Sequence, residues 1–66
     1  MTNEPELLTS VEAAQITRTP LATLRYWRHL GIGPRSFRIG RRVVYRKTDL
    51  HEWITSEERR TASPSA

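Results

Sequence analysis

The strongest chemical signal in the chain is a run of cations between Arg18 and Lys47. These 30 residues hold nine arginines or lysines and no acid, whereas the 66-residue chain has a formal net charge of +4, so the rest of it carries −5. Guanidinium groups grip phosphate oxygens, and clustered cations are the footprint of a surface that binds nucleic acid. A solvated charged face is the alternative. The cations are Arg18, Arg25, Arg28, Arg35, Arg38, Arg41, Arg42, Arg46 and Lys47.

The chain lacks the sets of residues that catalysis and metal binding need. The chain has no cysteine, and its two histidines, His29 and His51, stand far apart. The adjacent acids Glu57 and Glu58 come near the chain end, where no pocket is expected around them. The segment 31–33 lacks the flanking strand and helix of a nucleotide-binding loop. We therefore predict neither an enzyme nor a metal or cofactor site.

The size of the chain allows one small domain with a modest core. At 66 residues, folding buries only about 60% of the surface that the unfolded chain exposes, so function is expected on the surface. No apolar run approaches the roughly 20 residues that span a bilayer, and residues 1–6 do not resemble a signal peptide. We expect a soluble protein of the bacterial cytoplasm, associated with the nucleoid and without a membrane partner.

The first helix is marked by a capping box. Thr9 and Glu12 have the spacing at which each side chain bonds the other residue's backbone amide. The helix is therefore predicted to begin at Thr9 or Ser10 and to run through Ile16, with Leu8 packing as a hydrophobic staple.

The second helix follows after a three-residue break. Thr19 is expected to cap free amides and Pro20 to occupy the first helical position, so the helix runs from Pro20 to His29 or Leu30, where Gly31 ends it. Two short helices joined in this way form a helix-turn-helix.

The two faces of the second helix differ in chemistry. Leu24 and Trp27 fall on an inward side flanked by Leu21 and Leu30. A small residue on the opposite side permits close approach to a major groove. That exposed side holds Ala22, Arg25, Tyr26 and His29.

A β-hairpin is predicted next, because apolar residues alternate with arginines over 36–39 and 42–46, around a turn at Gly40 and Arg41. Arg41 and Arg42 would stand at its tip. A hairpin that follows a helix-turn-helix is called a wing. Its inward face is expected to hold Phe37, Ile39, Val43 and Tyr45.

A last helix is predicted from a cap at Thr48 and Asp49 to a C-terminal end between residues 56 and 59. Its narrow apolar stripe would dock it on the domain. The stripe holds Leu50, Trp53 and Ile54.

These elements predict a mainly α fold with a small β-hairpin, a winged helix-turn-helix with a C-terminal helix. We expect a flexible N-terminus over residues 1–6, the DNA-binding domain over 7–58 and a disordered tail over 59–66.

Four segments carry a resemblance to a known family. They read LTSVEAA at 8–14, TPLATLRYW at 19–27, FRIGRRVVYR at 37–46 and DLHEWI at 49–54. Together they resemble the excisionase and AlpA-type winged-helix family, which is related to the MerR-type DNA-binding domain. The small size and the arginine bias make the chain most similar to excisionases of mycobacteriophage-type elements.

The resemblance implies a recombination directionality factor that binds repeated sites in an attachment region, bends DNA and helps a tyrosine integrase excise a prophage. It also places the second helix in the major groove and the wing on the minor groove or backbone. Arg25 and Tyr26 match the Arg-Tyr pair of the MerR-type helix, and Arg41 and Arg42 match the wing tip. The chain lacks the coiled coil of full-length MerR regulators, so no small-molecule effector is expected.

The candidate site follows from these assignments. The residues expected at the major groove are Thr19, Thr23, Arg25, Tyr26, Arg28 and His29. Those expected on the wing are Arg38, Arg41 and Arg42. Those expected to contact phosphates are Arg18, Arg46 and Lys47.

Two other functions fit the same residues. One is a small transcriptional regulator of the AlpA type, and the other is an interaction module whose basic face binds a protein or an anionic lipid. The expected partners are double-stranded DNA, a tyrosine integrase and neighbouring copies on DNA. Such weak self-association would place an acidic patch against an adjacent basic face. The patch consists of Glu52, Glu57 and Glu58.

Overall fold

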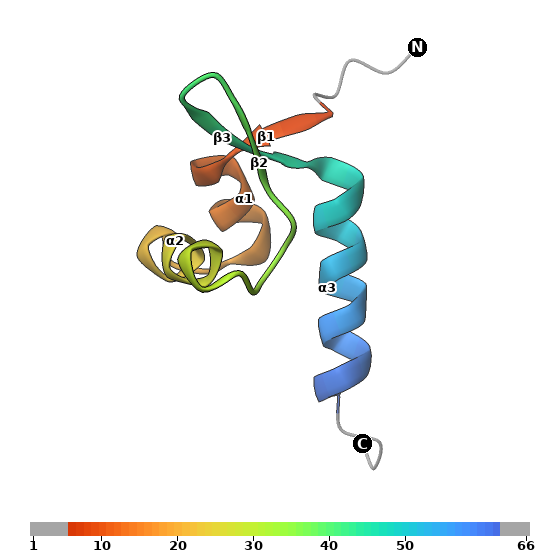
Figure 1. Cartoon of the computed structure of the whole chain (residues 1–66). Helices are drawn as coiled ribbons and strands as arrows, with labels where there is room; N and C mark the ends of the chain where they lie inside the picture. The colour runs from red at the N-terminus through yellow and green to blue at the C-terminus, as the bar shows by residue number, and fades with distance from the viewer. Residues whose placement is uncertain (1–5, 63–66) are drawn as a thin grey trace.

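The computed structural model describes residues 6–62, and these build three helices and a small sheet. In Figure 1 the sheet lies at one end of the molecule, α1 and α2 lie beside it, and α3 runs away from it. The winged helix-turn-helix fold is confirmed. The elements are β1 (Leu7–Thr9), α1 (Ser10–Thr17), α2 (Leu21–Leu30), β2 (Phe37–Ile39), β3 (Arg42–Arg46) and α3 (Lys47–Thr61).

The predicted capping box is present at the start of α1. The Glu12 amide donates to Thr9 Oγ1 at 3.1 Å, and the Thr9 amide donates to Glu12 Oε1 at 2.8 Å. Arg18 ends the helix in the left-handed conformation, with φ 57°. The chain therefore turns sharply toward α2 directly after α1.

The start of α2 differs from the prediction. Thr19 does not cap it, because the Thr19 amide donates to the Ala14 carbonyl and its hydroxyl donates to the Thr17 carbonyl, at 3.0 and 3.2 Å. Both groups are directed back to α1, so Pro20 is the N-cap residue and α2 begins at Leu21. The predicted stop is confirmed, since Gly31 adopts a left-handed φ of 77°.

The sheet has a third strand that the sequence analysis missed. Its order is β1-β3-β2 with antiparallel neighbours, and Leu8 pairs with Tyr45. Leu8 is buried in this strand. β1 is only three residues long, so its sequence carries no alternation long enough to indicate a strand. Its partner β3 lies in a distant part of the chain.

The inward face predicted for the hairpin is partly wrong. The two-residue turn pairs Ile39 with Arg42 and Phe37 with Val44, and directly paired residues point to the same side of a sheet. Phe37 and Ile39 therefore lie on the outer face, 38% and 52% exposed. The face toward the helices holds Leu8, Val43 and Tyr45.

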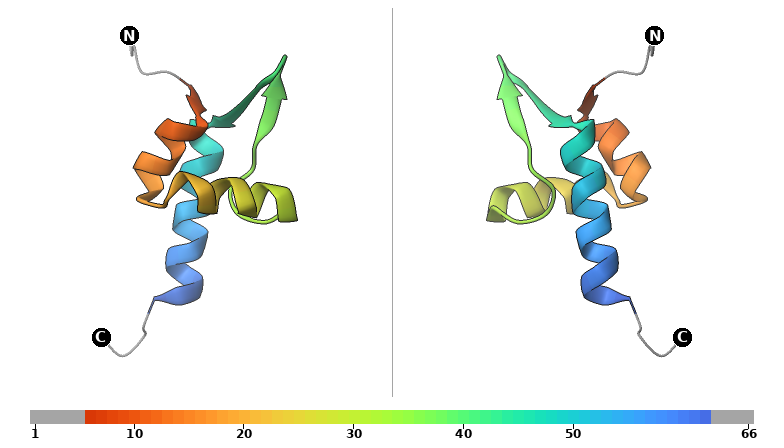
Figure 2. Two further views of the ribbon diagram at one scale, coloured as in Figure 1. Left: turned by 90° about the vertical axis from the view of Figure 1, so that its left-hand side faces the viewer. Right: turned by 90° about the vertical axis from the view of Figure 1, so that its right-hand side faces the viewer.

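The core gathers side chains from every element except β2. Two alanines of α1 are buried, and their small size lets α2 and β3 approach closely. Leu30 does not flank this core as predicted but is 51% exposed, because the C-terminal end of α2 extends past α1 and α3 (Figure 2). The core residues are Leu8, Ala13, Ala14, Leu24, Tyr45 and Leu50.

The last helix is longer than predicted at both ends. It begins at Lys47 without a side-chain cap, so the predicted cap at Thr48 and Asp49 is wrong. It continues to Thr61, and residues 59–61 of the predicted tail are therefore helical. The reason for the early start is that β3 leads directly into the helix, where the Lys47 amide donates to the Glu6 carbonyl at 2.7 Å.

The boundaries of the predicted flexible ends shift accordingly. Glu6 was expected in the flexible N-terminus, yet its carboxylate lies 2.7 Å from the Arg46 guanidinium. Residues 1–5 and 63–66 lie outside the described part of the chain.

Two tryptophan rings tie α3 to α2. The ring centroids of Trp53 and Trp27 lie 5.6 Å apart, and the ring planes are tilted by 52°.

Candidate nucleic-acid interface

The outward face of α2 presents the side chains that the sequence analysis placed there. Leu24 is the residue of α2 that the core buries, and this orientation turns Arg25, Tyr26 and His29 outward. Tyr26 is 60% exposed. Ala22 lies on the same exposed face, so the backbone of α2 has no bulky side chain in front of it at that point. This surface suits close approach to a groove of DNA.

The wing extends its cations on a tight turn. Gly40 occupies the first position of the two-residue turn and has a φ of 62°. The favoured two-residue hairpin turns require a positive φ at this position, and glycine adopts it without strain. Arg41 and Arg42 are exposed at the tip, and Arg38 is exposed on the strand before it. Figure 2 shows that the wing and the C-terminal end of α2 project from the same side of the molecule.

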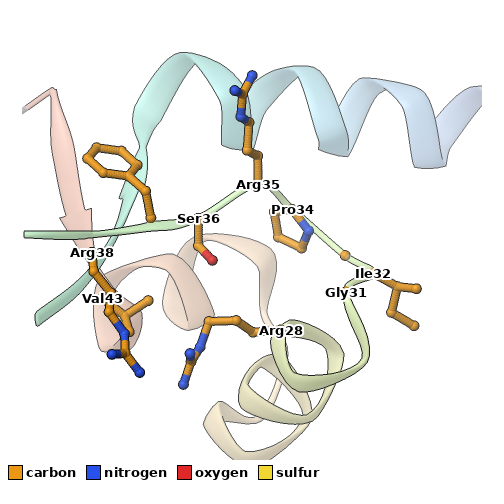
Figure 3. A pocket seen from close by; sticks show the side chains of 10 residues that line it. Arg28, Gly31, Ile32, Pro34, Arg35, Ser36, Arg38 and Val43 are labelled. Carbon is orange, nitrogen blue, oxygen red and sulfur yellow. The ribbon is translucent and has the colours of Figure 1, made fainter.

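A groove of about 550 Å³ separates α2 from the wing. Arg28 of α2 and Arg38 of β2 line it, and Figure 3 shows their side chains extending into the same side of the groove. Arg35 also lines the groove, but its side chain extends the other way, toward α3. The groove thus joins two cations that are ten positions apart in the sequence.

The remaining predicted residues differ in how freely they can reach DNA. Arg18 is exposed in the turn between the two helices. Thr19 and Thr23 are half-buried, and the hydroxyl of Thr19 is already bonded to the Thr17 carbonyl.

Arg46 stands at the base of the wing, away from its tip. It stands at the end of β3 opposite the tip, where its guanidinium pairs with Glu6 at 2.7 Å and lies 5.6 Å from the centre of the Phe37 ring. Lys47 follows it at the start of α3. These contacts give the Arg46 guanidinium partners within the protein, and the phosphate contact expected from the sequence stays a prediction.

Ser36 lines the groove but was not predicted as a site residue. Tyr45 was predicted as an inward-facing residue of the hairpin and belongs to the core. Burial raises the pKa of Tyr45, whereas the positive charge of Arg28 and a hydrogen bond with Ser36 act in the opposite direction. The position of Ser36 in the groove depends on how the wing stands against α2, so no local pattern in the sequence indicated it.

Residues 6–62 hold no group of three histidine, cysteine or acidic side chains that could bind a metal ion. Within the same range, no helix is both long enough and apolar enough to cross a membrane.

Comparison with known proteins identifies the family. The sequence profile described as "Helix-turn-helix domain" matches residues 7–58, a range that covers α1, α2, the whole sheet and most of α3. No curated protein and no solved structure matches the chain. Because the match takes in both helices of the motif and the wing beside them, the chain belongs to the helix-turn-helix domain family and is a DNA-binding helix-turn-helix protein.

Proposed function

We propose that this protein binds double-stranded DNA with α2 in the major groove and the wing on the adjacent minor groove or backbone. The observation that carries the proposal is the projection of α2 and the wing from one side of the molecule, each with exposed cations. B-DNA offers a major groove about 12 Å wide, into which a helix fits, with phosphates along both edges. Base contacts would come from Thr23, Arg25, Tyr26 and His29.

The biological role that we propose is that of an excisionase, which bends DNA at repeated sites and promotes prophage excision with a tyrosine integrase. The resemblance to the excisionase and AlpA-type family supports this role. Transcriptional regulation of the AlpA type is the second candidate, because it would use the same surface. Either role requires the protein to be in the bacterial cytoplasm, at the nucleoid.

Copies of the protein are proposed to associate weakly side by side on DNA through the acidic patch of Glu52, Glu57 and Glu58. One member of the patch is already engaged, since Arg60 donates two hydrogen bonds to Glu57, at 2.7 and 3.2 Å. These bonds lower the pKa of Glu57. Glu52 and Glu58 are exposed, so they are the acids available to a neighbour.

The two roles are separated by DNA bending and by excision. For an excisionase, gel shifts on circularly permuted fragments of the attachment region should show stepwise complexes with strong bending, and deletion of the gene should abolish most prophage excision. A single unbent complex at a promoter, with excision unchanged by the deletion, would establish the transcriptional role instead.

The wing contact predicts a change in salt dependence. Arg42→Gln should reduce the slope of log K against log salt by about 0.9, because each lost phosphate contact removes one released counterion. Affinity should fall similarly on all sequences. The measurement is fluorescence anisotropy with a labelled duplex over a series of salt concentrations.

Arg46→Gln is the matched control for that experiment. Arg46 lies on the same strand, but its partner is Glu6, so we expect its replacement to leave the slope close to that of the unmodified protein. Equal slopes for the two variants would count against the assignment of the wing tip to the DNA backbone.

A further inference from the structure

The groove between α2 and the wing has a composition suited to one anion. Its lining comes from the end of α2, the 31–36 segment and the hairpin, and among residues 6–62 no carboxylate lines it. Arg28 and Arg38 enter it from separate elements and lie on the same side (Figure 3). Two guanidinium groups at one opening repel each other unless an anion lies between them.

The Ser36 hydroxyl is a neutral part of the polar lining. In Figure 3 it points to the side of the groove on which Arg28 and Arg38 extend. Tyr45 is 1% exposed; burial raises its pKa, and the positive charge of Arg28 and a hydrogen bond with Ser36 act in the opposite direction.

The segment that carries Ser36 is held firmly against the domain. Pro34 is buried. Gly33 has a φ of 82°, and a Cβ at this position would come within 3.0 Å of the Trp27 Cβ. The chain thus passes so close to Trp27 that the position suits glycine alone. An anchored segment loses little conformational freedom when an anion binds, which favours a built site over an adaptable surface.

We propose that this groove binds a single DNA backbone phosphate, held between Arg28 and Arg38 with the Ser36 hydroxyl as a further donor. The inference rests on the proposed binding of DNA. A phosphodiester offers two non-bridging oxygens and one negative charge, which two guanidinium groups and a hydroxyl match. The site lies between the helix and the wing, so one phosphate held there fixes the spacing at which both enter their grooves. Arg28 is then a phosphate contact and reads no base.

The test replaces single phosphates of the bound duplex by neutral methylphosphonate linkages, one position at a time. The unmodified protein should lose about tenfold in affinity at one particular linkage, the size of effect expected for a charge-assisted contact. Arg28→Gln and Arg38→Gln should each bind the ordinary duplex more weakly, and both should lose much of their sensitivity to the neutral linkage at that same position, because one of the two guanidinium contacts is gone. Circular dichroism checks that each variant is folded.

Arg35→Gln is the matched control, because Arg35 lines the same groove but points toward α3. This variant should keep the full sensitivity to the neutral linkage. The inference is overturned if Arg28→Gln and Arg38→Gln lose sensitivity at two different linkages, or if Arg28→Gln alters base preference instead. A protein that fails to bind any duplex would overturn the proposed function, and this site with it.

Discussion

Replacing Leu24 by alanine is expected to lower the free energy of unfolding by about 2–5 kcal/mol, as is typical when a buried leucine leaves a cavity. Leu24 is 1% exposed and is the side chain by which α2 enters the core. The total free energy of unfolding of a 66-residue domain is only about 3–10 kcal/mol. The variant should therefore lose a large part of its stability, and with it the orientation of the outward face of α2.

Urea denaturation followed by circular dichroism measures this loss. Leu30→Ala is the matched control, because Leu30 belongs to the same helix and is 51% exposed. Its replacement should cost under about 1 kcal/mol. Equal losses for the two variants would show that Leu24 does not anchor α2 in the core.

Replacing Arg25 by alanine should weaken binding to the specific DNA site by roughly 1–3 kcal/mol, or about 5- to 150-fold, if Arg25 pairs with a guanine. Arg25 is exposed on the face of α2 opposite the core, near the small side chain of Ala22, so its guanidinium can reach the floor of a groove. Binding to unrelated DNA should change much less, because that binding depends on the phosphates.

Anisotropy titrations with the specific duplex and a scrambled duplex give the specificity ratio directly. Arg28→Gln is the comparison variant, since a phosphate contact should weaken both duplexes by the same factor. Specific binding of Arg25→Ala within error of the unmodified protein would show that the recognition surface lies elsewhere.

Local signals in the sequence predicted the elements whose stability is local. The capping box of Thr9 and Glu12 lies within one helical turn, and Gly31 adopts the left-handed conformation that ends α2. The Gly40 turn fixes the hairpin register. In each case the residues that give the signal also make the contact. The motif that defines the fold was therefore visible without the structure.

The errors arose where contacts with another element, or the register of the strands, decide the outcome. Thr19 has the residue type of an N-cap, but its amide and hydroxyl bond back to α1. β1 exists because β3 pairs with it across most of the chain. Phe37 and Ile39 were placed inward from their hydrophobicity, although the two-residue turn by itself puts them on the face of Arg42 and Val44. That error could have been avoided by following the register.

The candidate site was predictable in part. The outward residues of α2 follow from helical periodicity, and the arginines at the wing tip follow from the hairpin. The pairing of Arg46 with Glu6 joins residues 40 positions apart, and the groove of Arg28, Arg38 and Ser36 depends on how the wing stands against α2. Such arrangements depend on tertiary packing, which periodicity does not encode.

The central claim is that the outward face of α2 and the wing form the DNA-binding surface. A titration of the ¹⁵N-labelled full chain with a short duplex, followed by NMR, tests it most directly. We predict that the largest amide shift changes fall in residues 22–29 and 38–42 and that they disappear as salt is raised. Changes concentrated on α3, or an absence of salt-sensitive changes in α2 and the wing, would contradict the account.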